Sequence, residues 1–331
     1  MKVEEQMKIL VAGAGGFIGG HLLQELEKHH DLVIGVDLKP VSGWFLLPKK
    51  STPVVADLRL IEETQKVTKG ITMVFNLAAD MGGMGFIENN KAKCMESVLI
   101  NTHLLKSAVK NKVSKFFFAS SACVYASWHQ KTLEATSLKE QDAYPADPED
   151  GYGWEKLFSE RMCRHFEEDY GIETRVARYH NVYGPFGTFE GGREKVPAAA
   201  CRKVIEAIKR EDFQINIWGD GKQLRSFTYI DDCVAGTIKL MESNFNLPLN
   251  IGSSEMISIQ KLYETIIDIA GYSVKDFEFS YDLNAPQGVR GRSSNNELCL
   301  KQLQWEPTTK LKDGLKKTYE WISDQLVFTK S

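Results

Sequence analysis

The glycine-rich segment at residues 13–19 constrains the fold of this chain more than any other feature. It reads Gly-Ala-Gly-Gly-Phe-Ile-Gly, follows an apolar run at residues 8–12 and opens a helical pattern at residues 17–28. Glycines at such a place permit a tight turn and let a pyrophosphate approach the amides of the helix N-terminus. A plain tight turn is the alternative, but the flanking strand and helix favour a dinucleotide site.

The first half of the chain alternates short β-branched runs with helical patterns, which is typical of a parallel sheet with crossover helices. Further strands are predicted at residues 32–37, 73–78, 115–120 and 173–178, and helices at residues 91–110 and 152–170. Gly171 marks the predicted end of the last helix. These elements predict an α/β fold built on a Rossmann-type doubly wound parallel sheet.

From Gly184 onward the alternation of strand and helix patterns ends. Glycine and proline turns follow, around a helix predicted at residues 196–209. The 331 residues exceed one typical core, so a second, smaller unit is expected. We therefore expect a Rossmann domain at residues 1–185 and a discontinuous C-terminal substrate lobe at residues 186–225 and 252–331. Residues 226–251, a strand then a helix at 226–241 and a strand at 247–251, are expected to return to the sheet.

The charge distribution argues against several classes of partner. A formal net charge of -3 does not favour binding to nucleic acid, and no basic run is long enough to bind a membrane surface. The apolar runs are far shorter than a membrane span, and the charged residues 1–6 contain no apolar signal segment, so a cytoplasmic location is expected. The six cysteines have no CxxC spacing and the histidines no metal spacing, so neither a metal site nor a disulfide framework is predicted.

Asp37 ends the second predicted strand, 18 residues after Gly19. An acidic side chain there can accept hydrogen bonds from the ribose hydroxyls and repel a 2′-phosphate, which favours NAD over NADP. A strand-end aspartate that caps a turn is the alternative. The other predicted contacts to the cofactor are Gly13, Gly16, Phe17, Ile18, Gly19, Asp57, Leu58 and Ala78.

Tyr152 and Lys156 lie four residues apart on a predicted helix, so they share one face and reach the same end of a cofactor. Ionising a free tyrosine at pH 7 costs roughly 4 kcal/mol, because its pKa is near 10. A neighbouring ammonium and a positive nicotinamide can supply much of this. Ser121, at the end of a strand, can bind the same substrate oxygen, whereas Tyr and Lys alone would more simply be a solvated helix face.

With the glycine loop, Asp37, Ser121, Tyr152 and Lys156 in this order, the chain resembles the extended short-chain dehydrogenase/reductase superfamily of NAD-dependent epimerases and dehydratases. The resemblance covers essentially the full length. It implies a Rossmann-type domain, a C-terminal substrate lobe and hydride transfer at a sugar carbon that carries a hydroxyl group.

Cys123 lies two residues after Ser121, so in an extended backbone both side chains point to the same side. Hydride removal from a sugar carbon produces a ketone, which acidifies the carbons on either side of it. A thiol beside that ketone is a plausible acid or base. Taken alone, a cysteine is more often a small buried hydrophobe.

Several further motifs together resemble the GDP-mannose 3,5-epimerase family. They are Asp-Met-Gly-Gly-Met-Gly at residues 80–85, Ser-Ser-Ala-Cys at 120–123, Gly-Gly-Arg-Glu-Lys at 191–195, Trp-Gly-Asp-Gly at 218–221 and Gly-Val-Arg-Gly-Arg at 288–292. The resemblance implies GDP-mannose as substrate, GDP-L-galactose and GDP-L-gulose as products, and a homodimer. It also implies that Cys123 and Lys195 are an acid/base pair acting from opposite faces of the ring. The substrate-binding residues that it implies are Gly82, Ser121, Asn181, Lys195, Lys203, Arg225 and Arg290.

Three alternatives stay open at this point. A nucleotide-sugar 4-epimerase would leave Cys123 and Lys195 without a task, and a 4,6-dehydratase would be expected to carry an acidic residue in place of Cys123. A catalytically silent dinucleotide-binding regulator is the alternative outside enzymes. The intact set of Ser121, Tyr152 and Lys156 argues against it.

Overall fold

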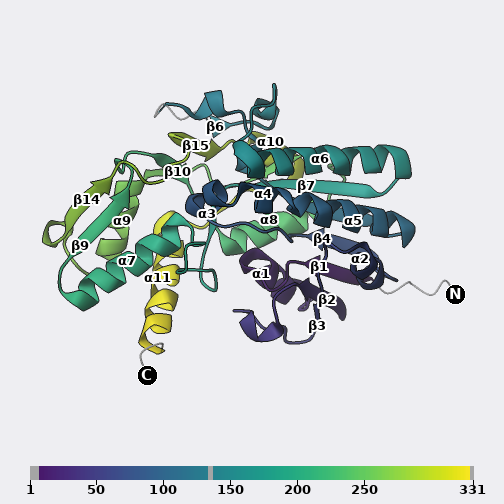
Figure 1. The fold of residues 1–331 in the computed structure, drawn as a ribbon, viewed down its shortest axis with the longest axis horizontal. Coiled ribbons are helices and arrows are strands. Elements are labelled where there is room, and N and C mark those ends of the chain that lie inside the picture. Colours follow the sequence, from purple (N-terminus) through teal and green to yellow (C-terminus); the bar gives the residue numbers. More distant parts are fainter. Residues whose placement is uncertain (1–6, 133–136, 329–331) are drawn as a thin grey trace.

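The computed structural model describes residues 7–132 and 137–328, so the expectation for residues 1–6 lies outside the described residues. Its central sheet has seven parallel strands in the order β12-β7-β5-β4-β1-β2-β3 (Figure 1). The strands are β1 (Lys8–Ala12), β2 (Leu32–Asp37), β3 (Thr52–Val55), β4 (Met73–Asn76), β5 (Lys115–Ser121), β7 (Glu173–Tyr179) and β12 (Leu249–Ile251). The chain winds outward in both directions from β1 and β4, which confirms the predicted doubly wound parallel sheet.

Side-chain alternation along each strand decides which residues pack on which face of this sheet. Ile9 and Val11 of β1 pack in a core with Leu22, whereas Leu10 packs with Leu104 on the other face. Helices α1 and α8 therefore cover one face, and α2, α5 and α6 cover the other (Figure 1). These helices are α1 (Phe17–Leu26), α2 (Ile61–Val67), α5 (Ser97–Lys110), α6 (Asp150–Tyr170) and α8 (Ile230–Glu242).

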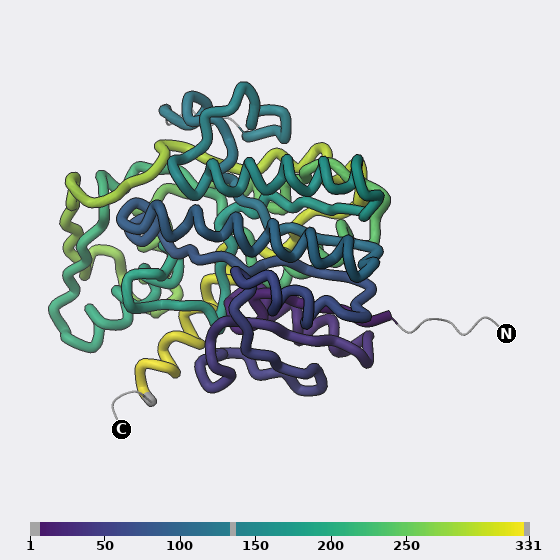
Figure 2. Tube along the Cα trace, turned by 45° about the vertical axis from the view of Figure 1, so that its right-hand side comes forward, coloured from purple at the N-terminus to yellow at the C-terminus, as the bar shows by residue number. Residues whose placement is uncertain are grey.

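A smaller lobe lies to the left of the sheet in Figures 1 and 2. It contains a four-stranded sheet in the order β13-β10-β15-β6, a β14-β9 pair and three helices, α7, α9 and α11, that pack on one another. The bounds are β6 (Ser137–Leu138), β9 (Gln214–Trp218), β10 (Leu224–Ser226), β13 (Met256–Ser258), β14 (Glu278–Asp282), β15 (Gly291–Ser294), α7 (Val196–Arg210), α9 (Ile259–Ile269) and α11 (Leu311–Phe328).

Shorter elements connect the two parts. They are the strands β8 (Val182–Tyr183) and β11 (Thr228–Tyr229), which pair with each other, and the helices α3 (Met84–Asn89), α4 (Lys91–Met95) and α10 (Glu297–Leu303). Single 3-10 turns are η1 (Val41–Gly43), η2 (Ala122–Val124), η3 (Ser127–Gln130), η4 (Glu140–Ala143) and η5 (Val274–Asp276).

Two predicted elements differ from the sequence pattern at points where a side chain binds a backbone amide. The single helix predicted at residues 91–110 is wrong, because it divides into α4 and α5 at Glu96. At this turn the Ser97 hydroxyl accepts a hydrogen bond from the Asp80 amide at 3.0 Å, which the helical period does not encode. Strand β4 ends at Asn76, whose side-chain oxygen accepts from the Ala78 amide at 3.3 Å.

Glu27 ties the connection between β2 and β3 to the end of α1. Its buried carboxylate accepts hydrogen bonds from the amides of Lys49, Lys50 and Ser51 and from the Ser51 hydroxyl, at 2.6 to 3.2 Å. Burial alone would raise the pKa of Glu27, but these hydrogen bonds outweigh it and lower the pKa to about 2. The ionised carboxylate is therefore part of the folded structure at neutral pH.

We expect Glu27→Gln to lower the free energy of unfolding by roughly 2–3 kcal/mol at pH 7, because the amide loses charge-assisted hydrogen bonds. The pKa of Glu27 is lower in the folded chain than its ordinary value of 4.5. Its stabilising contribution is thus complete above about pH 4.5 and is lost as the pH falls toward 2. Urea denaturation of both proteins at neutral pH and at about pH 3.5 should show the difference shrinking, and an equal difference at both values would contradict this account.

Candidate active site

The glycine turn between β1 and α1 lies against the backbone at the end of β4. Gly13 has a φ of +85°, and a Cβ there would lie 2.8 Å from the amide nitrogen of Ala78. A Cβ on Gly19 would lie 2.0 Å from the carbonyl oxygen of Gly13. Only glycine fits both positions, and the turn brings two predicted cofactor segments together at the point where the strand order reverses.

Asp37 lies at the end of β2 beside this turn. One carboxylate oxygen accepts from the Gly15 amide at 3.0 Å and the other from the Lys39 amide at 2.9 Å. Asp37 thus caps its own turn and also borders the glycine loop. The geometry therefore fits both the turn-capping and the ribose-binding interpretation of this residue. Lys39 and Trp44, which the sequence analysis did not single out, also border the glycine loop. The Lys39 ammonium donates to the Gly15 carbonyl at 2.8 Å. A Cβ on Gly15 would lie 2.5 Å from the Trp44 indole nitrogen.

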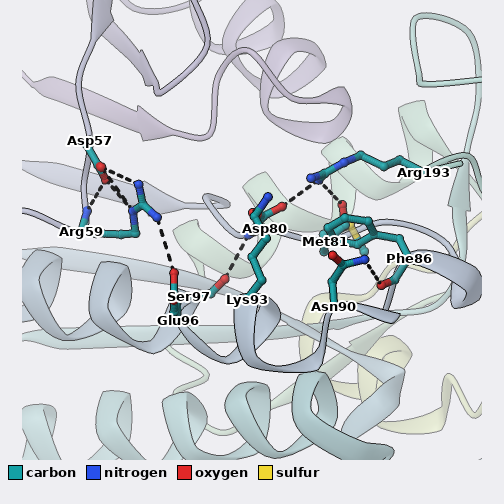
Figure 3. Close-up of polar contacts among 10 residues, drawn as sticks. All are labelled: Asp57, Arg59, Asp80, Met81, Phe86, Asn90, Lys93, Glu96, Ser97 and Arg193. Carbon is teal, nitrogen blue, oxygen red and sulfur yellow. Dashed lines mark hydrogen bonds and ion pairs between the residues drawn. The ribbon is translucent and has the colours of Figure 1, made fainter. Parts of the chain in front are cut away.

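The remaining predicted cofactor residues have distinct surroundings. Asp57 is held by Arg59 in a bidentate pair of 2.9 and 2.7 Å, and Arg59 also lies 3.5 Å from Glu96 (Figure 3). The hydrogen bonds from Arg59 lower the pKa of Asp57 and outweigh burial, which acts to raise it. Leu58 is buried, Gly16 donates its amide to Gly13, and Phe17 and Ile18 are partly buried against the main core. Their contact with a cofactor stays a prediction.

Ser121, Tyr152 and Lys156 meet where β5 ends and α6 begins. The Lys156 ammonium lies 5.5 Å from the ring centre of Tyr152 and 4.8 Å from that of Phe118. Burial raises the pKa of Tyr152 well above 10, and so do Cys123 and Glu155, while the Ser121 hydroxyl lowers it as a hydrogen-bond partner. Tyr152 is therefore protonated in the chain itself, and acting as a base requires an additional positive charge beside it.

Glu155 is a neighbour of this group that the sequence did not indicate. Its carboxylate lies 3.4 Å from the Lys156 ammonium, and both side chains are almost completely buried. The other oxygen of Glu155 accepts a hydrogen bond from Ser159 at 3.0 Å. The lysine therefore carries its own buried counter-charge, since a charge at this depth is stable only when it is paired.

Cys123 lies next to Ser121, although the extended backbone predicted between them is wrong. The chain turns into η2 directly after Ser121, whose hydroxyl accepts from the Cys123 amide at 3.2 Å. Cys123 packs with Tyr152 in one small buried cluster. Burial, followed by the negative charge of Glu149, raises the pKa of Cys123 to about 11, so the thiol is protonated at neutral pH.

Arg292 and Glu149 are site residues that the sequence analysis missed. The buried Arg292 guanidinium lies 3.7 Å from the Cys123 sulfur, donates to Gln130 at 2.7 Å and also pairs with Glu149. Burial acts to lower the pKa of Arg292, but Glu149 and Cys123 outweigh it and raise the pKa. The motif at residues 288–292 contains two arginines, and only the packing shows which one reaches the thiol.

Lys195 comes from the lobe, immediately before α7, and is half-buried. Burial lowers its pKa, the positive charge of Arg292 lowers it further, and the charge of Cys123 acts in the opposite direction. Lys195 and Cys123 are thus close enough for their charges to interact. Within residues 7–132 and 137–328, nothing forms a hydrogen bond or ion pair with the Lys195 ammonium. A lysine with a lowered pKa and no fixed partner gives up its proton more readily than an exposed lysine does.

A pocket of about 610 Å³ opens beside Cys123, and its lining includes Met84, Glu149 and Arg290. The predicted substrate residue Arg290 pairs with Asp220 at 2.9 and 3.1 Å on this wall. Gly82 lies close to both Phe86 and the backbone of Arg193, where a Cβ would lie 2.8 and 3.2 Å from them. The binding of a substrate by Gly82 and Arg290 stays a prediction.

The other three predicted substrate residues bind backbone carbonyl oxygens. Asn181, with a φ of +40°, donates to Ser226 at 2.9 Å, and the Lys203 ammonium donates to Asn216 at 2.7 Å. Arg225 donates to Gln287 and Val289, and burial together with Arg292 lowers its pKa to about 10. Their role toward a substrate stays a prediction.

The described residues contain no metal-binding cluster, no disulfide and no membrane-spanning helix. No group of three His, Cys, Asp or Glu side chains in this part of the chain is placed to hold a metal ion. The six cysteines are all buried and free. None of the described helices has the length and apolar character to cross a membrane.

The known protein family and the curated proteins that this chain resembles agree with one another, because all are epimerases or related enzymes. A model of the NAD dependent epimerase/dehydratase family matches residues 9–252. The GDP-mannose 3,5-epimerase 1 of Oryza sativa subsp. japonica is 46% identical over 324 residues, which are 97% of this chain and 83% of the relative. The GDP-mannose 3,5-epimerase of Arabidopsis thaliana is 44% identical over 97% of this chain and 84% of its own length.

Solved structures of similar fold include nucleotide-sugar epimerases. The UDP-glucose 4-epimerase of Thermotoga maritima with UDP-glucose is 27% identical, has a TM-score of 0.85 and covers 97% of this chain and 100% of its own. The UDP-glucuronic acid 4-epimerase of Bacillus cereus, in complex with UDP-glucuronic acid and NAD, is 29% identical with a TM-score of 0.81 and covers 97% of this chain and 100% of its own.

The raised pKa of Cys123 predicts how its alkylation depends on pH. Only the thiolate reacts with iodoacetamide, so the labelling rate of Cys123 should rise about tenfold for each pH unit from neutrality toward its pKa. Glu149→Gln removes a negative charge beside the thiol and should increase the rate at a given pH. Peptide mass spectrometry measures this, with the fully buried Cys94 as an internal control. A rate independent of pH, or a slower Glu149→Gln variant, would contradict the assignment.

Proposed function

Because the chain belongs to the NAD dependent epimerase/dehydratase family, we propose that it acts as a GDP-mannose 3,5-epimerase. It converts GDP-D-mannose to GDP-L-galactose, and to GDP-L-gulose where only C5 is inverted. The observation that carries the proposal is the packing of Cys123 against Tyr152 in one buried cluster. Lys195 is near enough to Cys123 for the thiol to influence its pKa. This arrangement suits a reaction with two proton transfers next to a redox centre.

The glycine turn, Asp37 and the backbone at Ala78 would hold NAD, since the turn leaves no space for a Cβ where a pyrophosphate must approach. NAD bound there would supply reversible hydride acceptance for C4 of the hexose, with no net oxidation. Tyr152 exchanges a proton with the C4 hydroxyl, and Ser121 holds the same oxygen. Lys156 stabilises the phenolate of Tyr152 from 5.5 Å.

A carbonyl group at C4 makes the hydrogens on C3 and C5 acidic, and Cys123 and Lys195 then move protons at these two carbons. The two groups differ in their resting state. Cys123 has a raised pKa and holds a proton, whereas Lys195 has a lowered pKa and can be deprotonated. One group can therefore donate a proton while the other accepts one.

The alternatives leave these residues unexplained. A 4-epimerase, the activity named for the two solved structures above, needs no thiol and lysine at the sugar. A 4,6-dehydratase is expected to carry an acid in place of Cys123. A dinucleotide-binding regulator would need neither the Ser121, Tyr152 and Lys156 set nor the pocket beside Cys123.

We also propose the division of labour expected from the sequence. Residues 1–185, with the return at 226–251, hold the cofactor, and residues 186–225 and 252–331 hold the sugar nucleotide. The placement of β12 at the edge of the main sheet supports the return of the middle segment. Six free, buried cysteines support a location in the reducing cytoplasm.

The test is NMR of the protein with GDP-mannose and NAD⁺ in D₂O. We expect deuterium at C5 and C3 together with new hexose isomers. Cys123→Ala and Lys195→Ala should each lower the exchange at least about 100-fold, because each removes a group that transfers a proton. Tyr152→Phe should abolish exchange at both carbons, because no ketone forms. No exchange by the unmodified protein would reject the proposed substrate.

A homodimer is also proposed, and an exposed apolar surface on α4, α5 and α6 supports it. The surface consists of Met95, Leu99, Trp154 and Phe158, each 42 to 55% exposed. Helices α5 and α6 pack side by side, so these residues lie on the same outer layer (Figures 1 and 2). Such a surface is suited to a second copy of itself, because a twofold interface repeats the same patch.

Light scattering after size exclusion should give twice the mass of one chain for the unmodified protein. The double substitution of Trp154→Glu and Phe158→Glu should yield a monomer, because it buries two carboxylates in the interface. Leu283→Glu alters an equally exposed apolar residue of the lobe, 63% exposed, and should leave the dimer intact. A dimer that persists in the double variant would exclude this surface.

A further inference from the structure

An ion pair joins the loop that carries Lys195 to the segment that follows β4. The Arg193 guanidinium donates to a carboxylate oxygen of Asp80 at 2.7 Å and to the Met81 carbonyl at 3.2 Å (Figure 3). It also stacks on the ring of Phe86, with 3.8 Å between the guanidinium carbon and the ring centre. We call this contact the Asp80–Arg193 latch.

The loop turns at two glycines just before the latch and is held closely after it. Gly191 and Gly192 both have a φ of +83°, and the Gly192 amide donates to the Glu194 carboxylate at 2.7 Å. The Gly83 amide then donates to the Arg193 carbonyl at 3.0 Å, and a Cβ on Gly83 would lie 2.4 Å from the Glu194 carbonyl. The loop is thus held against the segment after β4 at the point where Arg193 crosses to it.

Asp80, the acidic partner in the latch, is itself held in place by two other contacts. Asp80 donates its amide to the Ser97 hydroxyl at 3.0 Å, and its second carboxylate oxygen lies 3.1 Å from the Lys93 ammonium. Phe86 packs against the buried cluster that contains Cys123 and Tyr152. Arg193 therefore connects the Lys195 loop to the same wall that holds the thiol and the tyrosine.

The other side-chain ion pair of this loop does not make that connection. Glu194 pairs with Arg202 of α7 at 3.2 Å, and both residues belong to the lobe. Among the described residues, the side-chain ion pair that carries the loop across to the sheet is the one between Arg193 and Asp80.

We propose that Asp80 and Arg193 are positioning residues, which fix Lys195 at the correct distance from the sugar carbon that faces away from Cys123. The proposal rests on the proposed function, in which Lys195 transfers a proton. Proton transfer needs a heavy-atom separation within hydrogen-bond reach, and a displacement of about 1 Å costs about 100-fold in rate. The ion pair itself is largely exposed and contributes little to the stability of the fold.

The variants are Arg193→Gln and Asp80→Asn, which each remove one charge of the latch, and Asp80→Asn also keeps the shape of the side chain. We expect each to lower deuterium exchange from D₂O into the sugar about 100-fold, with KM for GDP-mannose little changed. Oxidation at C4, followed by the absorbance of reduced nicotinamide in a single turnover, should keep its rate because Tyr152 and Ser121 are not moved. The double variant should be no slower than either single one, since both remove the same contact.

Two controls separate positioning from general damage. Lys93→Gln removes the other partner of Asp80 but touches no part of the loop, so its exchange rate should stay within about threefold of the unmodified protein. Arg193→Lys keeps a positive charge for Asp80 and should recover part of the exchange. Thermal unfolding of every variant should be close to that of the unmodified protein.

The outcomes are distinguishable. Loss of exchange with C4 oxidation preserved supports the latch. Full exchange in Arg193→Gln, equal loss of exchange and C4 oxidation, or an equal effect of Lys93→Gln overturns it. If the unmodified protein itself exchanges no deuterium, the proposed function fails instead, and the latch proposal falls with it.

Discussion

The close packing of the glycine turn against the backbone at the end of β4 is the constraint on which the site depends. A Cβ on Gly13 would lie 2.8 Å from the Ala78 amide nitrogen, so the turn and the strand end can meet only through glycine. The strand order reverses at this point, and the chain leaves it in both directions. Doubly wound sheets bind their ligands at such a reversal, and β5 brings Ser121 and, in the turn after it, Cys123 to the same edge of the sheet.

Burial sets the protonation of the three groups that the site brings together. Removal from water disfavours the charged form of each, so the pKa of Tyr152 and of Cys123 is raised and that of Lys195 is lowered. Glu149 raises the pKa of the Cys123 thiol, whereas Arg292 lowers it. The site therefore contains neutral or easily neutralised groups, which suits an enzyme that must both give and accept protons.

The two sides of the site come from different parts of the chain. Cys123 and Tyr152 belong to the sheet and α6, whereas Lys195 belongs to a loop of the lobe that starts at two glycines with positive φ. Their relative position is a property of the contact between the two parts. The proposed redox residues thus belong to the sheet and α6, whereas the lysine proposed to transfer protons belongs to a loop that the Asp80–Arg193 latch joins to the segment after β4.

The sequence by itself determined the elements and the residues whose roles follow from local spacing. Hydrophobic periodicity located most of the strands and helices. The order of the glycine turn, Ser121, Tyr152 and Lys156 predicted a redox centre, and these three side chains lie together in the structure. Tertiary structure alone decided that Arg292 reaches Cys123, 169 positions earlier, and that Arg193 reaches Asp80, 113 positions earlier. It also broke the helix at Glu96 and turned the chain after Ser121. Local patterns encode local hydrogen bonding, whereas the pairing of distant charges depends on how the elements pack.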